Sequence, residues 1–120
     1  MEHQIEIYKS VDNAIELQVS LDKDTVWLNQ AQMASLFMQT KQNVSLHITN
    51  CFKEKELEQK SVVKEFLTTA SDGKKYKTKF YNLDVIISVG YPVKSKQGIQ
   101  FRQWATQRLK YYFYEYRISA

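Results

Sequence analysis

Residues 29–52 contain the pattern that most restricts the possible fold of this chain. In both halves of the segment, apolar residues recur at the spacing of one helix face: Met33, Leu36, Phe37, Val44, Ile48 and Phe52. Asn29 is a suitable N-cap for the first half and Thr40 for the second, which leaves three residues for a turn. The segment therefore predicts a helix-turn-helix, a motif whose second helix can enter the major groove of DNA.

The outward side of the second predicted helix, residues 41–51, is polar and carries no acidic residue. Its predicted DNA-contacting residues are Lys41, Gln42, Asn43, Ser45 and His47. Glutamine and asparagine make paired hydrogen bonds to adenine, and lysine pairs with phosphate. An ordinary helical hairpin with a solvated polar face is the alternative interpretation. The turn has Met38 and Gln39 where the motif usually has a glycine and an apolar residue, so we expect Met38 to be partly exposed.

A lysine-rich β-hairpin is predicted after the helix pair. Residues 62–69 have strand-forming composition, residues 75–81 alternate, and Gly73 between them supplies the positive φ of a tight turn. The basic side chains near this turn are Lys74, Lys75, Lys77 and Lys79. A cationic hairpin in this position resembles the wing of a winged helix, so we predict that Lys74, Lys75 and Lys77 bind the DNA backbone. The alternative is that these lysines only prevent association between sheet edges.

The first quarter of the chain predicts a further β-hairpin and a short strand. Residues 4–21 alternate apolar and polar side chains around a turn at Asp12 and Asn13. Residues 25–28 form a short β-like run that leads into the first helix. Within that run, Trp27 is predicted to pack the hairpin against the helix pair.

Two more helices are predicted in the last third of the chain. Asn82 can cap a short apolar helix over residues 83–89, ended by Gly90. A long helix then covers about residues 99–114, with Arg102 and Arg108 as secondary candidates for DNA contact. The predicted fold is α+β, a single winged helix-turn-helix-like domain over residues 1–120, with an N-terminal β-hairpin and a long C-terminal helix.

The distribution of charge favours a polyanionic partner. The chain has 120 residues and a formal net charge of +4. Residues 1–60 hold six Lys/Arg and nine Asp/Glu, whereas residues 61–120 hold eleven and four, so the positive charge lies in the second half. The lone Cys51 forms no internal disulfide, and neither a signal peptide nor an apolar run of membrane-spanning length occurs. These features predict a cytoplasmic protein.

The residue patterns that typically mark an active site are missing from the sequence. The two histidines and the single cysteine have no metal-ligand spacing, and the three glycines do not form a phosphate-binding loop. Cys51 and His47 stand at i, i+4, but a buried structural thiol is the better interpretation of Cys51. We therefore expect no enzymatic activity, no cofactor, no metal and no small-molecule substrate.

Two stretches of the sequence resemble the RhuM family of bacterial virulence-associated proteins. The first is VWLNQAQMASLF, residues 26–37, and the second is KFYNLDVIISVGYPVKSKQGIQFRQWA, residues 79–105. The resemblance implies that this chain is the N-terminal domain of a longer protein. The second stretch is also loosely similar to the N-terminal DNA-binding domain of Bro-type phage and viral proteins, which implies a nucleic-acid partner.

The resulting functional hypothesis is double-stranded DNA binding through the helix-turn-helix and the lysine-rich hairpin. The domain would act as a transcriptional regulator or as the targeting module of a larger protein, and as a homodimer, since one recognition helix reads only a half-site. The alternative is a protein-interaction or dimerisation module that uses the tyrosine-rich end of the C-terminal helix, residues 111–116.

Overall fold

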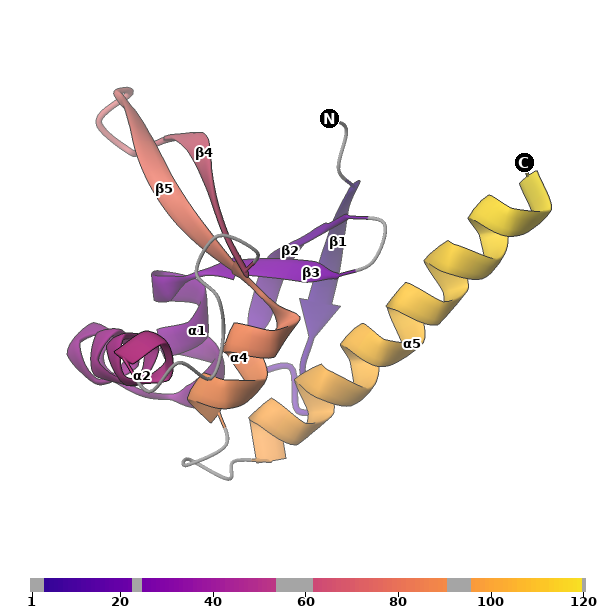
Figure 1. The fold of residues 1–120 in the computed structure, drawn as a ribbon, viewed down its shortest axis with the longest axis horizontal. Helices are drawn as coiled ribbons and strands as arrows, with labels where there is room; N and C mark the ends of the chain where they lie inside the picture. Colours follow the sequence, from indigo (N-terminus) through magenta and orange to yellow (C-terminus); the bar gives the residue numbers. More distant parts are fainter. Residues whose placement is uncertain (1–3, 23–24, 54–61, 91–95, 120) are drawn as a thin grey trace.

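The computed structural model describes residues 4–22, 25–53, 62–90 and 96–119, with the side chains of 112–119 excepted. The described residues form five strands and four helices: β1 (Gln4–Lys9), β2 (Glu16–Leu21), β3 (Val26–Asn29), α1 (Gln30–Phe37), α2 (Lys41–Lys53), β4 (Val63–Thr69), β5 (Lys75–Asn82), α4 (Leu83–Gly90) and α5 (Lys96–Ser119). The predicted hairpins, helix pair and C-terminal helices are all present (Figure 1).

The five strands form one antiparallel sheet in the order β1-β2-β3-β5-β4. β1 pairs with β2, and β4 pairs with β5, which gives the two predicted hairpins. β3 joins these hairpins, because it pairs with β2 on one side and with β5 on the other. The strand that leads into the helix pair is therefore hydrogen-bonded to the second strand of the hairpin that follows the pair.

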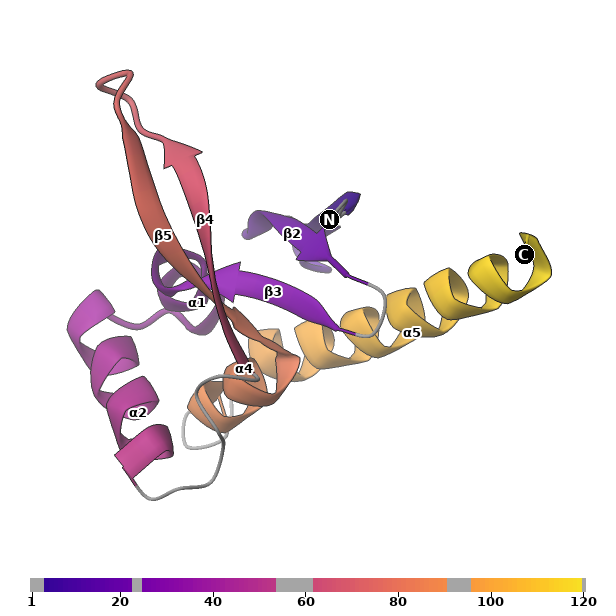
Figure 2. The ribbon, with the colours of Figure 1, turned by 45° about the horizontal axis from the view of Figure 1, so that its top comes forward.

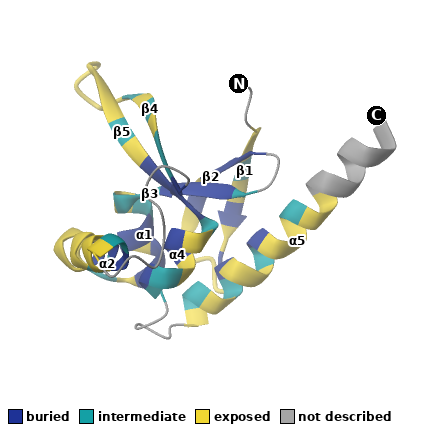
Figure 3. Cartoon of the chain, viewed as in Figure 1, coloured by how far each residue is buried: buried dark blue, intermediate teal, exposed yellow. Residues whose placement is uncertain are grey.

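The core lies on one face of this sheet. Leu21 pairs with Val26 and Leu28 pairs with Tyr81, so these side chains share a face, and all four belong to the main buried cluster. Helices α1, α4 and α5 cover the same face with their buried residues, which are Met33, Leu36, Phe37, Val85, Ile86, Val89, Phe101 and Ala105. Figure 3 shows these buried positions gathered where the helices meet the sheet.

Trp27 lies on the opposite face of β3, which corrects the prediction that it packs against the helix pair. It alternates with Val26 and Leu28, whose side chains point into the helix-covered core. Lys64 of β4 covers the Trp27 ring, with its ammonium nitrogen 4.7 Å from the ring centroid. The same nitrogen lies 2.8 Å from a carboxylate oxygen of the mostly buried Asp22. This contact holds the first strand of the second hairpin to the turn that follows β2.

The second hairpin extends past the helices as an exposed two-stranded ribbon (Figure 2). Gly73 at its turn has φ of +81°, as the sequence predicts. Asp72 accepts hydrogen bonds from the backbone N–H of Lys74 at 2.9 Å and from the hydroxyl of Tyr76 at 2.6 Å. The hydrogen bond from Tyr76 lowers the pKa of Asp72, so the turn is most firmly held when this carboxylate is ionised.

Helix α5 is longer than the predicted 99–114 at both ends. Phe101 and Ala105 anchor it, and Tyr8 of β1 meets the rings of Phe101 and Trp104 edge-on, with each centroid separation 5.2 Å. Its C-terminal half leads away from the sheet (Figure 1). The predicted tyrosine-rich interface falls mainly on residues 112–116, whose side chains lie outside the described part.

Candidate nucleic-acid interface

Local capping interactions fix both helices of the predicted helix-turn-helix. The Asn29 side chain accepts from the backbone N–H of Gln32 at 2.8 Å, while the Gln32 side chain accepts from the N–H of Asn29 at 2.9 Å. This reciprocal pair is a capping box. At the start of α2, the Thr40 hydroxyl accepts from the N–H of Asn43 at 3.1 Å. Both N-caps predicted from the sequence are confirmed.

The turn between the helices contains a residue in a left-handed backbone conformation. Met38 has φ of +54°, at the position where a glycine is usual. Its side chain is 75% exposed, as expected from the sequence. The backbone N–H of Gln39 still reaches the carbonyl oxygen of Ala34 at 2.9 Å, so the end of α1 is closed despite the missing glycine. The short turn is therefore made at the cost of backbone strain at Met38.

Helix α2 separates an apolar inner side from a polar outer side. Val44, Ile48 and Cys51 are buried, and the Cys51 thiol is thus buried as predicted. The predicted contact residues Lys41, Gln42, Asn43 and Ser45 are exposed, and His47 is half-buried. The exposed outer side also includes Leu46, Thr49 and Asn50. All predicted contact residues of α2 are therefore reachable from solvent, although His47 only in part.

A shallow groove of about 520 Å³ lies along this outer side. It is lined by Gln30, Lys41, Gln42, Ser45, Leu46 and Thr49. Gln30, the first residue of α1, donates a hydrogen bond from its side-chain amide to the carbonyl oxygen of Lys41 at 2.8 Å. Leu46 is 57% exposed and is the apolar member of an otherwise polar lining. Residues 25–53, which include both helices, contain no Asp or Glu.

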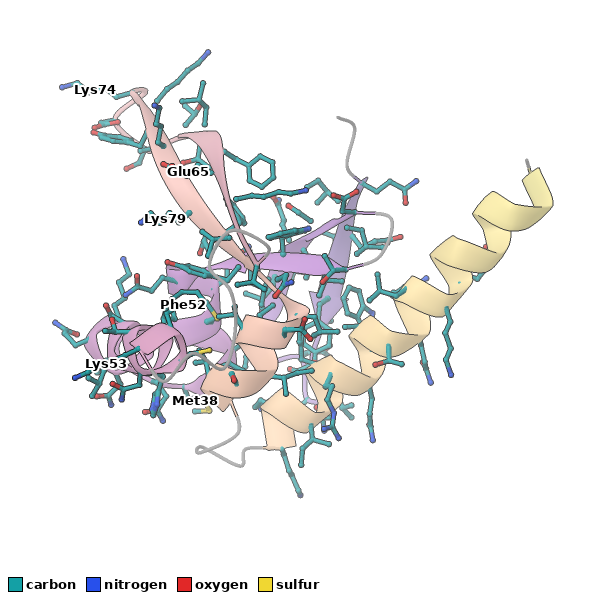
Figure 4. The ribbon with its side chains drawn as sticks, in the orientation of Figure 1. Met38, Phe52, Lys53, Glu65, Lys74 and Lys79 are labelled. Atoms are coloured by element: carbon teal, nitrogen blue, oxygen red, sulfur yellow. The ribbon has the colours of Figure 1, made fainter. Side chains whose placement is uncertain are left out.

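The lysines of β5 point to the side of the sheet on which the helices lie. Lys75, Lys77 and Lys79 alternate in step with Tyr81, which faces the helix-covered core. Near the turn the helices no longer cover this face, so these three lysines are exposed there. Figure 4 shows Lys79 extending from β5 on the side of α2, with Lys74 at the tip of the hairpin.

The β3–β5 pairing connects the lysine face with the groove. Asn29 pairs with Phe80, so Gln30 begins α1 at the level of Lys79. The Gln30 side chain then reaches the start of α2 through its hydrogen bond to Lys41. Glu65 pairs with Lys79 across the hairpin and offsets part of its charge. The exposed side of α2 and the cationic face of the hairpin therefore open toward the same side of the sheet.

Arg102 and Arg108 are separated from this surface. Both are exposed on α5, and α4 lies between α5 and α2 (Figures 1 and 2). The predicted contact set omits three residues that line the groove and one lysine that adjoins it. The lining residues are Gln30, Leu46 and Thr49, and the adjoining lysine is Lys79. The alternation of residues 75–81 already places Lys79 with Lys75 and Lys77, whereas the position of Gln30 depends on strand pairing between distant segments.

The family comparison matches the second half of the domain. A family model described as the Virulence protein RhuM family matches residues 61–117, which include β4, β5, α4 and most of α5. This match supports the assignment of the chain to the RhuM family. No curated protein and no solved structure matches this chain significantly.

Two features are absent from the part of the chain that the structure describes. No helix in that part combines the length and the apolar character needed to cross a membrane. Within the same residues, no group of three or more His, Cys, Asp or Glu side chains is placed to hold a metal ion.

Proposed function

We propose that this domain binds duplex DNA as a winged helix, with α2 in the major groove and the β4–β5 hairpin on the backbone. The observation that carries the proposal is the common orientation of two surfaces. The exposed side of α2 and the lysine face of β5 open to one side of the sheet, with Gln30 between them. The absence of acidic residues from residues 25–53 removes the charge that would repel phosphate.

The order of the elements supports the proposal. A strand, two helices joined by a three-residue turn, and a hairpin follow one another as β3, α1, α2, β4 and β5. The sheet order β3-β5-β4 places the last strand in the middle, and this order supports the proposed winged-helix arrangement. In this arrangement the hairpin lies beside the second helix and can reach the backbone that flanks the groove.

The outer side of α2 has the chemistry needed to read bases. The 13-residue helix is about 20 Å long, and a major groove about 12 Å wide admits a helix. Gln42 and Asn43 can form paired hydrogen bonds to adenine, and Ser45 can donate to or accept from a base edge. Lys41 at the start of α2, with Lys74, Lys75 and Lys77 of the hairpin, would bind phosphates and fix the helix in register.

The test is a titration of duplex DNA at several salt concentrations. Replacing Lys77 by Gln is expected to weaken binding and to reduce the slope of log affinity against log salt by about 0.9, because one phosphate contact is lost. Lys9→Gln is the matched control, because Lys9 is an exposed lysine on β1 at the other edge of the sheet. Equal slopes for the two variants, or no binding at low salt, would contradict the proposal.

The base contacts need a separate measurement. Gln42→Ala and Asn43→Ala are expected to reduce the preference for a selected sequence over random DNA while leaving the salt slope unchanged. The domain would then serve as a transcriptional regulator or as the targeting module of a longer protein, without catalysis of its own. If binding is salt-sensitive but neither substitution changes the sequence preference, the protein binds the DNA backbone and α2 does not contact the bases.

Self-association through the sheet edge is the second candidate function. β1 is an edge strand, and its outer side exposes Ile5 and Ile7 to 51% and 49%. Unpaired edges of this kind accept a further strand, so two copies can join at β1 and present two copies of α2 to two half-sites. Ile7→Lys is expected to lower the molar mass in sedimentation from dimer to monomer. Leu67→Lys, an equally drastic change on the other edge strand β4, is the control.

A further inference from the structure

We propose that the outward face of α5 is a second binding surface for the backbone of duplex DNA, separate from α2 and the hairpin. This surface lies beyond α4 as seen from α2, so it cannot contact the same short stretch of duplex (Figures 1 and 2). With both surfaces occupied, one domain would hold two DNA segments together. The inference does not depend on α2 entering a groove.

The charge pattern of α5 is unusual for a helix that is merely solvated. Residues 96–111 contain four Lys or Arg and four Gln but no Asp or Glu. Exposed helices normally mix both signs, since Glu and Lys at i, i+4 stabilise the helix by about 0.2–0.5 kcal/mol per pair. This part of α5 contains no such pair and instead presents cations and amides, which are the groups that bind phosphate oxygens.

Packing fixes which side of α5 faces outward. Phe101 and Ala105 are buried against the sheet, so the opposite side of the helix is in solvent. There, a shallow groove of about 480 Å³ is lined by Arg102, Gln103, Thr106, Gln107 and Lys110. Lys96, Gln103 and Lys110 are spaced by seven residues, so they follow one line along the helix. That line is about 21 Å long, which corresponds to roughly six base-pair steps of DNA.

The acidic side chain that contacts α5 lies away from this line. Asp12 accepts a hydrogen bond from the side-chain amide of Gln97 at 3.5 Å. Gln97 precedes Phe101 by four residues and therefore shares the inward side of the helix. Arg102 is exposed and lines the groove, so its guanidinium is accessible to an external anion.

The experiment compares two variants that each lose three positive charges. In the first variant, Lys96, Arg102 and Lys110 of α5 are changed to Gln. In the matched variant, Lys41, Lys77 and Lys79 of the first surface are changed to Gln. All six positions are exposed, and at the four helical positions glutamine has nearly the helix propensity of the residue it replaces, so both variants should fold. Circular dichroism and thermal unfolding check this directly.

Two readouts are needed, both with the full chain. The first is energy transfer between two short duplexes labelled with different dyes, which reports whether they are held together. The second is affinity for one duplex as a function of salt. We expect the wild type to bring the duplexes together, and we expect the α5 variant to bind one duplex with its sequence preference intact but without energy transfer.

The outcomes separate this inference from the proposed function. Energy transfer by the α5 variant equal to that of the wild type overturns the second surface. So does the absence of transfer by the wild type when the matched variant has lost its affinity for one duplex. Unchanged affinity and sequence preference in the matched variant, together with lost transfer in the α5 variant, overturns the role of α2 and retains the surface on α5. Loss of all binding in the α5 variant alone would show that α5 is the main DNA-binding surface, which contradicts the proposed function only.

Discussion

The side-chain amide of Gln30 donates a hydrogen bond to the backbone carbonyl oxygen of Lys41, 2.8 Å away, and so joins the first residues of α1 and α2. Because this contact is exposed, Gln30→Ala should lower the free energy of unfolding by only about 0.5–1 kcal/mol. DNA affinity should fall roughly two- to tenfold, since the start of α2 loses its support and the groove loses a lining residue.

The matched control for Gln30 is Ser35→Ala, an exposed position on the same helix. Urea unfolding and fluorescence anisotropy with a labelled duplex measure the two quantities. Equal loss of DNA affinity in both variants would show that the Gln30 contact does not position α2.

Leu46 presents an apolar side chain at the centre of the proposed base-reading side. With 57% exposure it contributes little to the core, whereas apolar contact is how a protein recognises the methyl group of thymine. Removing that methyl, by replacing thymine with uracil in the duplex, should cost the wild type about 0.8 kcal/mol of binding free energy. In Leu46→Ala the same replacement should cost much less. An equal cost in both proteins would exclude Leu46 from methyl recognition.

Met38→Gly is expected to stabilise the domain. The residue has φ of +54°, which costs a side chain roughly 1–2 kcal/mol. Glycine removes that strain, little burial is lost, and its greater freedom in the unfolded chain cancels part of the gain. We expect a net increase of about 0.5–1 kcal/mol in the free energy of unfolding. Met38→Ala, which retains a β-carbon, should show no such increase, and thermal unfolding of both variants tests the assignment to backbone strain.

Gly90→Ala is expected to destabilise the packing of α4 on α1. A β-carbon at Gly90 would lie 2.5 Å from Cε1 of the Phe37 ring, and Phe37 is buried, so the ring has little room to move. Overpacking of this kind costs typically about 1–3 kcal/mol. Adding Phe37→Leu should restore part of the loss, and the two effects should therefore not add. Additive losses in the double variant would assign the effect to another cause.

The tip of the second hairpin should loosen in acid. The Tyr76 hydroxyl and the Lys74 amide hold the pKa of Asp72 below its ordinary value of 3.8. A lowered pKa means that ionised Asp72 stabilises the turn above about pH 4, and that this contribution is lost as pH falls through the lowered value. NMR shifts of Tyr76 and Gly73 should therefore titrate below pH 4. In Asp72→Asn this titration should disappear; its persistence would point to another acid.

Local chemistry made much of this fold predictable. Asn29 and Thr40 cap the two helices as expected, and Gly73 takes the positive φ of its turn, because each depends on residues only a few positions away. Trp27 lies on the face opposite to the predicted one. Alternation in a strand defines two faces but does not say which one the helices will cover, and that choice depends on pairing with distant strands.

In the candidate site, too, some features follow from local sequence and others depend on pairing between distant strands. The exposure of Gln42 and Asn43 follows from the helix period, and both residues are exposed. The place of Gln30 beside the start of α2 required the β3–β5 pairing, which joins residues about fifty positions apart. The sequence pattern places Arg102 and Arg108 off the apolar stripe of their helix, but it carries no information about which side of the domain that helix occupies.

β3 has four residues, and it is hydrogen-bonded to the hairpin while continuing directly into α1. Since successive residues of a strand face opposite ways, inserting one residue in β3 would turn the entry into α1 toward the other side of the sheet. The cationic side chains of the hairpin and the outer side of α2 would then face different sides of the sheet. Among relatives of this protein, the length of β3 should therefore vary less than the identity of the residues on either surface. The insertion or deletion of one residue in β3 would separate the two surfaces more completely than a substitution on either surface.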